Sequence, residues 1–213
     1  MKKSIVITLS ISALIMVGCD VLDKYPLDKP SQETFYTNAL EINGGINACY
    51  KFLQETDESS YVFPIVLDCM SDIGFPRQDN DFKTIAKGEQ DDKNGTIGKT
   101  WKRAYQGIGR CNNMLQVIDE KSSLLSESEI KQFRGEVLFL RAYYYTRLVT
   151  YFGDVPLILK SVESVDEGLN VTRTPKDQII DQIFADYDEA AQLLPLTYSA
   201  AADKGRATSG TAN

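Results

Sequence analysis

The sequence predicts an all-α fold of stacked helical hairpins, and three observations carry this prediction. Apolar residues recur at steps of three or four in four separate segments, which is the spacing of helices that bury one face. Cap residues, glycines and prolines mark where several of these segments begin and end. The link 119–125 between two long segments is short, so those two helices are expected to lie side by side.

The first helix is expected to begin at about Thr37. Its apolar stripe consists of Ile42, Ile46, Cys49 and Leu53. Residues 61–70 are apolar and fit either a short helix or a buried extended piece. Residues 71–99 contain many glycines, charges and amides and show no sustained period. A loop of that length inside a compact domain is more often functional than passive, so a functional role is expected there.

The second helix is expected at about residues 99–118. Its apolar stripe consists of Trp101, Tyr105, Ile108, Cys111, Leu115 and Ile118. Trp101 could form a stacking platform for a sugar ring, but aromatic residues at helical spacing usually belong to the core. We therefore favour packing as its role.

The third helix has clear signals at both ends. Ser126 and Glu129 form a capping box at its start. Gly153 can adopt the conformation that ends a helix, and Pro156 cannot continue one. The apolar stripe between them consists of Ile130, Phe133, Val137, Leu140, Tyr144, Leu148 and Tyr151. We expect a long buried helix followed by a short extended run at residues 155–159.

The fourth helix is expected to begin with Thr174 as cap and Pro175 at the first helical position, and to stop at Pro195. Its apolar stripe consists of Ile179, Ile183, Tyr187, Ala190 and Leu194. Four acidic residues are expected on its solvated face, namely Asp181, Asp186, Asp188 and Glu189. No other ligands converge on them in the pattern, so no metal site and no cofactor are expected.

The composition narrows the function classes. The 213 residues include 23 Lys and Arg against 30 Asp and Glu, giving a formal net charge of −7. An acidic chain without a basic run is poorly suited to a phosphate backbone, so nucleic-acid binding is not expected. The chain has no histidine, which is the commonest general base and metal ligand. This absence weighs against an enzyme.

The amino terminus predicts export. Two lysines precede a short apolar run, and together they form a secretory signal peptide at residues 1–18. The residues Met16-Val17-Gly18-Cys19 resemble a bacterial lipobox, so Cys19 is expected to carry lipid. The alternative is an ordinary signal peptide with an incidental cysteine. Residues 19–30 are polar and read as a lipidated tether. The acidic residues just after Cys19 resemble the export signal of surface lipoproteins in the Bacteroidetes, which favours display on the outer membrane.

Three further cysteines remain in the chain. Cys49 and Cys111 each fall on an apolar helical stripe, and no spacing typical of a metal site exists. We favour three buried thiols at Cys49, Cys69 and Cys111. A single disulfide is the alternative.

Several stretches resemble the SusD/RagB family of outer-membrane lipoproteins, which capture glycans for a partner transporter. The most specific stretch is Arg141–Leu157, and weaker matches lie at Leu22–Pro26, Trp101–Asn113 and Gly205–Ala212. The resemblance implies a tetratricopeptide-like superhelix of helical hairpins. Family members are more than twice this length. Residues 31–213 therefore resemble the amino-terminal helical domain, truncated at its carboxyl end.

The resemblance implies a surface-anchored protein that captures oligosaccharide for a TonB-dependent transporter of the SusC type. Family sugar contacts in this half come from the loop that corresponds to residues 71–99. The candidate contacts there are Phe75, Arg77, Gln78, Asn80 and Phe82. The alternative for this segment is an ordinary polar loop or a contact with the transporter. A flat aromatic ring suits a sugar face, and planar polar groups suit its hydroxyls. The alternative function is a non-catalytic helical scaffold that binds protein partners, and a carboxylate-dependent glycosidase ranks last.

Overall fold

The computed structural model describes residues 35–54, 62–77, 81–162, 164, 166, 168 and 170–213. The chain divides into two compact units, residues 1–36 and residues 37–213. The second unit contains the helices discussed below. The predicted signal peptide at residues 1–18 and the tether at residues 19–30 lie outside the described residues.

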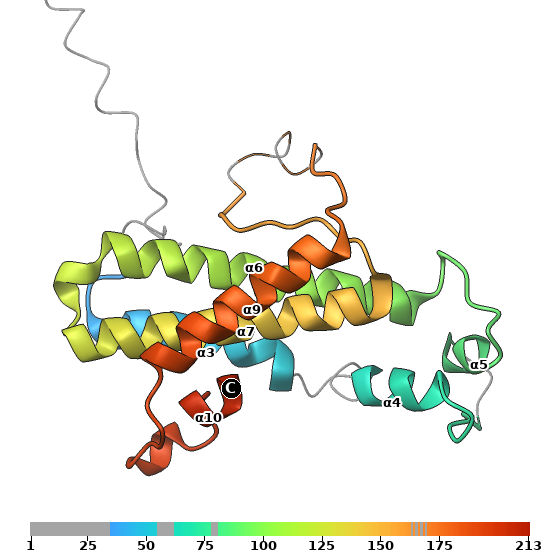
Figure 1. The fold of residues 1–213 in the computed structure, drawn as a ribbon, viewed down its shortest axis with the longest axis horizontal. Helices are drawn as coiled ribbons and strands as arrows, with labels where there is room; N and C mark the ends of the chain where they lie inside the picture. Colours follow the sequence, from blue (N-terminus) through green and yellow to red (C-terminus); the bar gives the residue numbers. More distant parts are fainter. Residues whose placement is uncertain are drawn as a thin grey trace, which may run out of the picture. The chain divides into compact units, whose positions relative to one another are not determined.

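The centre of the second unit is a hairpin of two long helices, α6 (Gly95–Glu120) and α7 (Glu127–Phe152), which lie side by side in Figure 1. The short 3-10 helix η2 (Ser122–Leu124) forms the turn between them. The predicted capping box is present, because the Ser126 hydroxyl accepts from the Glu129 amide and the Glu129 carboxylate accepts from the Ser126 amide. Gly153 ends α7 with a φ of 66°. Both predicted ends of this helix are confirmed.

Two more helices complete the core around α7. The helix α9 (Lys176–Leu193) crosses α7 obliquely in Figure 1, and α3 (Ala39–Gln54) packs against both α6 and α7. With three helices against it, α7 is buried on more sides than its predicted stripe. Its buried residues are Phe133, Gly135, Glu136, Val137, Leu138, Leu140, Arg141, Ala142, Tyr144, Tyr145 and Leu148. The predicted all-α fold of stacked helical hairpins is confirmed.

The carboxyl-terminal segment returns to the start of the fold. It contains η3 (Ala201–Asp203) and α10 (Ser209–Ala212), and α10 packs against α9. Arg206 in this segment donates to the side-chain oxygens of Asn43 and Asn47 on α3. Segments more than 150 residues apart therefore lie side by side.

Residues 71–99 were expected to form a continuous loop, and this expectation is wrong in two places. The loop contains the short helix α5 (Asp81–Ala86), and α6 begins at Gly95 instead of Lys99. The preceding residues form α4 (Val62–Cys69), which settles the ambiguity between helix and extended piece. Ile85 of α5 packs with Val66 and Cys69 of α4 in a small apolar cluster. This cluster gives α5 a partner that its own sequence does not show.

The start of α9 also differs from the prediction. Pro175 is the cap residue and Lys176 is the first helical residue, so Thr174 does not act as cap. Thr174 instead pairs with Val155 in an isolated antiparallel bridge, which holds the extended run after α7. None of the helices in the described part of the chain is both long and apolar enough to cross a membrane.

Candidate functional site

Of the predicted glycan contacts, Phe75 and Arg77 lie in the segment that joins α4 to α5, and Phe82 lies in α5. Phe75 is 67% exposed, and Arg77 is also exposed. Phe82 is partly buried and packs against the cluster of α4 and α5, so the structure places it in packing. Gln78 and Asn80 lie outside the described residues. The structure therefore leaves Phe75 and Arg77 as the solvent-facing candidates of this set.

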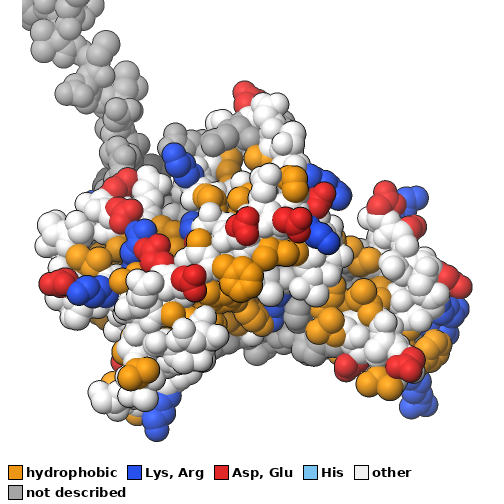
Figure 2. Space-filling view, in the orientation of Figure 1, with side chains coloured by type: hydrophobic (Ala, Val, Ile, Leu, Met, Phe, Trp, Pro, Cys, Tyr) orange, Lys and Arg blue, Asp and Glu red, His pale blue; other side chains and the backbone are white. Residues whose placement is uncertain are grey.

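Apolar side chains surround the same segment. The exposed ones are Leu67 at 45%, Met70 at 60%, Ile73 at 85% and Phe75 at 67%. Figure 2 shows hydrophobic atoms on the surface of α4 and α5. Exposed apolar groups that gather on one surface mark sites of interaction more often than isolated ones do.

The start of α5 is fixed to the start of α6 by the side chains of Asp81 and Asn94, which sequence reasoning missed. Asn94 caps α6 by accepting from the Ile97 amide at 3.1 Å. Its amide nitrogen also donates to the Asp81 carbonyl at 3.0 Å. The Asp81 carboxylate accepts from the Thr96 amide at 3.0 Å. The spacing of Asn94 before Ile97 was a visible cap signal.

A small apolar cavity lies beside this segment, with a volume of about 180 Å³. It is lined by Val66, Met70, Ile85, Gln90, Ile97, Thr100, Tyr151 and Phe152. Burial raises the pKa of Tyr151 to about 12, so its hydroxyl stays protonated. Trp101 stands against the Phe152 ring with 5.0 Å between centroids and lies 5.0 Å from Tyr105. These contacts support packing as the role of Trp101.

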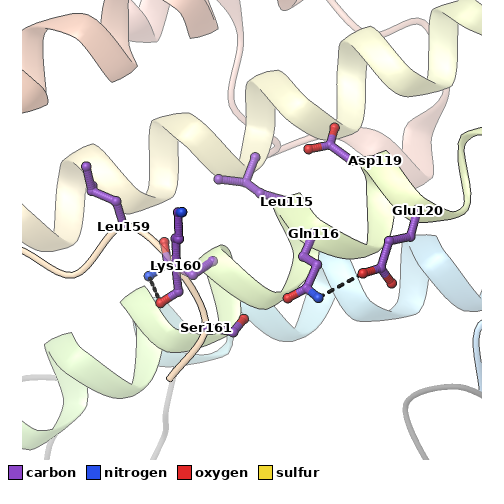
Figure 3. Close-up of a pocket in the computed structure, with 8 residues that line it drawn as sticks. Leu115, Gln116, Asp119, Glu120, Leu159, Lys160 and Ser161 are labelled. Atoms are coloured by element: carbon purple, nitrogen blue, oxygen red, sulfur yellow. Dashed lines mark hydrogen bonds between the residues drawn. The ribbon is translucent and has the colours of Figure 1, made fainter. Parts of the chain in front are cut away.

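A larger cavity of about 640 Å³ opens beside the second half of α6, and we call it the α6 cavity (Figure 3). It is lined by Asn112, Leu115, Gln116, Asp119, Glu120, Leu159, Lys160 and Ser161. Figure 3 shows Gln116, Asp119 and Glu120 on α6 and residues 159–161 on the segment after α7. No sequence pattern pointed to this cavity, because its two walls are far apart along the chain.

A buried ion pair holds one wall of the α6 cavity in place. Arg141 Nε and Nη2 donate to the two carboxylate oxygens of Asp186 at 2.7 and 2.8 Å. Arg141 Nη1 donates to Asn112 Oδ1 at 3.1 Å, and Asn112 Nδ2 donates to the carbonyls of Ile158 and Lys160 at 2.9 and 3.2 Å. Burial alone would lower the pKa of Arg141, but hydrogen bonds to Asp186 and its charge outweigh burial and raise it.

The burial of Asp186 corrects the prediction that it lies on a solvated face. Asp186 is 2% exposed, because it faces Arg141 across the contact of α7 and α9. A signal was present in the sequence, since Asp186 stands between Ile183 and Ala190 on the buried spacing of α9. A charge at such a position needs a buried partner.

The described residues contain few groups suited to covalent or metal chemistry. Cys49, Cys69 and Cys111 are free and buried, as the sequence predicted. Burial raises the pKa of Cys111, which keeps this thiol protonated and unreactive. No cluster of three potential metal ligands occurs among the described residues. The arrangement is suited to binding by hydrogen bonds and apolar contact.

Comparison with known proteins gives a consistent result. A SusD-like family model, described as "Starch-binding associating with outer membrane", matches residues 21–212. SusD-like protein P2 of Formosa agariphila is 27% identical over 213 residues, which cover 97% of this chain and 41% of that protein.

Solved structures agree with this match. A SusD-like carbohydrate-binding protein from Bacteroides fragilis aligns with a TM-score of 0.74 and 27% identity, over 84% of this chain and 36% of that one. Surface glycan-binding protein A from Bacteroides uniformis aligns with a TM-score of 0.69 and 25% identity, over 81% of this chain and 39% of that one.

The chain spans about two-fifths of the length of these relatives. The family match nevertheless covers nearly all of the sequence, including the helices that build both cavities. The chain belongs to the SusD-like family.

Proposed function

We propose that this chain forms part of a non-catalytic, surface-anchored lipoprotein that captures oligosaccharide for a TonB-dependent transporter of the SusC type. The observation that carries the proposal is the family match over residues 21–212. The names of the structural relatives, a carbohydrate-binding and a glycan-binding protein, point in the same direction. The absence of histidine and the burial of the three thiols support a role in binding.

The capture site in this part of the protein would use Phe75 and Arg77. An exposed phenylalanine offers a flat apolar face to the C–H face of a sugar ring, and the guanidinium offers several donors to neighbouring hydroxyls. Hydrogen bonds join Asp81, at the start of α5, to Asn94 and Thr96 at the start of α6. These bonds limit the motion of the end of the segment that leads into α5. Each such contact is weak, which suits a protein that must both capture and release its ligand.

Membrane attachment would depend on Cys19. The leader and the lipobox predict a lipid on this cysteine, and the family description names the outer membrane. Lipid on Cys19 would anchor the protein without a membrane-spanning helix. The intact mass of protein extracted from its own membrane tests this, because an unlipidated mass contradicts the anchor.

Retention on polysaccharide gels tests the capture site. Phe75→Ala and Arg77→Ala should each weaken retention about five- to ten-fold, since each removes one stacking or hydrogen-bonding contact of about 1 kcal/mol. Phe184→Ala and Arg173→Ala are matched controls, because both side chains are exposed and lie outside the segment. If all four variants behave alike, the assignment of the site to this segment is wrong. If the wild-type chain is retained by no glycan and instead co-purifies with a protein other than a porin, the scaffold function replaces glycan capture.

A further inference from the structure

The α6 cavity has the size of a ligand site and lies outside the segment of Phe75 and Arg77. Its volume of about 640 Å³ falls within the range of pockets that enclose small organic ligands. The chain therefore offers a second concave surface that the proposed capture site does not use. The side chains that line the cavity indicate which class of ligand it can bind.

The lining presents both donors and acceptors. Gln116 offers both kinds of group, Lys160 donates, and Asp119 and Glu120 accept. Leu115 and Leu159 add apolar surface between these groups. A sugar ring presents hydroxyls that both donate and accept, together with C–H groups that prefer apolar contact. This mixture matches the lining.

The charge of the lining distinguishes between classes of sugar. Two carboxylates face one ammonium, so the cavity carries a net negative charge. Asp119 also contacts Arg134 at 3.3 Å, but Arg134 is shared with Glu189 at 2.7 Å. The surroundings therefore remain acidic. A carboxylate or sulfate on the ligand would be repelled there, whereas an amino group would be attracted.

The lining is also held in position before any ligand arrives. Asn112 holds the backbone of residues 158–160 by donating to the carbonyls of Ile158 and Lys160. Arg141 in turn orients Asn112 by donating to its side-chain oxygen. Gln116 donates to Glu120 at 2.8 Å, as the dashed line in Figure 3 shows. A fixed lining lowers the entropy that binding must overcome.

One polar atom of this wall is unsatisfied. The Ser161 hydroxyl is buried and has no hydrogen-bond partner among the described residues. This oxygen is shielded from the open space of the cavity, so the hydrogen bonds to a ligand come from Gln116 and Lys160.

We propose that the α6 cavity binds a short stretch of saccharide whose units are uncharged or carry an amino group, and that it excludes uronates and sulfated sugars. The inference rests on the proposed function of glycan capture and adds to it a second contact region with a charge preference. Gln116 and Lys160 supply the hydrogen bonds, and Asp119 and Glu120 supply the charge preference.

The test uses the whole chain and three oligosaccharides of equal length and equal β-linkage, built from glucose, glucosamine or mannuronate units. Calorimetric titration should show binding of the glucose and glucosamine oligomers, with the glucosamine oligomer bound at least as tightly, and no binding of the mannuronate oligomer. Gln116→Ala should weaken binding about five-fold, the effect of one lost hydrogen bond. Gln106→Ala is the control, because Gln106 is exposed on the same helix and does not line the cavity.

A charge reversal gives a readout that mere loss of folding cannot imitate. Glu120→Lys changes the lining from two carboxylates and one ammonium to the reverse. This variant should lose its preference for the glucosamine oligomer and gain binding of the mannuronate oligomer.

If the chain binds glycans but all of these variants behave like Gln106→Ala, the cavity inference is overturned and the proposed function stands. If the wild-type chain binds the mannuronate oligomer as well as the others, the charge preference is overturned. If it binds no glycan of any class, the proposed function fails together with this inference.

Discussion

At the scale of single residues, three charged side chains are buried in the described part of the chain, and each of them has a high free-energy cost of burial. Glu136 is 0% exposed, Arg141 6% and Asp186 2%. A buried charge is tolerated only when a partner and further hydrogen bonds replace the water it has lost. Arg141 and Asp186 meet this condition with two short hydrogen bonds, and Arg141 also supports Asn112.

Removing one member of this pair should therefore be costly. Arg141→Met should lower the free energy of unfolding by about 3–5 kcal/mol, because it leaves the Asp186 carboxylate buried without a charged partner and with Gln182 as its remaining side-chain donor. The control is Arg134→Met, whose partners are exposed and whose effect should stay within about 1 kcal/mol. Urea denaturation of both variants measures the difference. The double variant Arg141→Met with Asp186→Leu should recover much of the loss, and equal stability of the two single variants would contradict the argument.

Buried tyrosines predict a loss of stability in alkali. Burial raises the pKa of Tyr145 and of Tyr151 to about 12, and it raises the pKa of Tyr144 further. Unfolded tyrosines lose their proton near pH 10. Between these values the folded chain binds more protons than the unfolded chain, so the free energy of unfolding falls as the pH rises.

The expected outcome is a stability that is lost progressively from about pH 10 to about pH 12. Urea denaturation at a series of pH values measures it. Tyr145→Phe should make the fall less steep, because one titrating group is removed. If the ultraviolet absorbance of the folded protein shows every tyrosine ionising near pH 10, the prediction is wrong.

At the scale of helices, the close approach of α6 and α7 depends on one glycine. A Cβ atom at Gly107 would lie only 2.5–2.8 Å from ring atoms of Tyr144. The Tyr144 ring is fully buried, and its hydroxyl donates to the Cys49 carbonyl at 2.7 Å, so it cannot easily move aside. The glycine therefore lets α6 and α7 pack closely while the ring reaches α3.

Two glycines on α6 allow a matched comparison. Gly107→Ala should destabilise the chain by about 1–3 kcal/mol, because the added methyl group overpacks the contact with Tyr144. Gly109→Ala, where nothing lies within 4 Å of the added atom, should stabilise it by about 0.5–1 kcal/mol through helix propensity. Thermal unfolding compares the two. A melting temperature for Gly107→Ala at or above that of Gly109→Ala would rule out the steric argument.

At the scale of the whole second unit, Arg206 joins the two ends of the helical domain. Its Nη1 donates to Glu136 Oε2 on α7 at 2.8 Å, and its Nη2 donates to Asn43 and Asn47 on α3 at 2.9 and 2.8 Å. Tyr50 strengthens the junction by donating to Glu136 at 2.7 Å and accepting from the Ala207 amide at 3.0 Å. The carboxyl-terminal segment is thus held by polar contacts.

Loss of Arg206 should release this segment. Arg206→Met leaves the Glu136 carboxylate buried with fewer partners and should cost about 3–5 kcal/mol. Hydrogen exchange should become faster in residues 196–213 and on the facing part of α3. Lys204→Met is the control, because Lys204 is exposed in the same segment. Unchanged exchange in residues 196–213 of the Arg206 variant would show that other contacts hold the segment.

Local patterns in the sequence were sufficient to predict the four long helices and the family. The capping box at Ser126, the stop at Gly153 and the apolar stripes all depend on residues within a few positions of each other, so they can be recognised without knowledge of any tertiary contact. The all-α class, the long central helix and the resemblance to SusD-like proteins could therefore be predicted and are confirmed.

Contacts between distant segments decided the rest. Asp186 is buried because Arg141 faces it from α7. The helix α5 is held by apolar contacts with α4 and by hydrogen bonds to the start of α6. Phe82 packs against the apolar cluster of α4 and α5 and is therefore partly buried. The α6 cavity exists only because residues 159–161 return to α6, about 40 residues after the helical positions they face. Such features depend on which surfaces meet in space, and the periodicity of one segment carries no information about its partner. The sequence by itself thus determined the four long helices and the family, and the tertiary structure alone decided where the short helix α5 forms, which charges are buried and where the cavities lie.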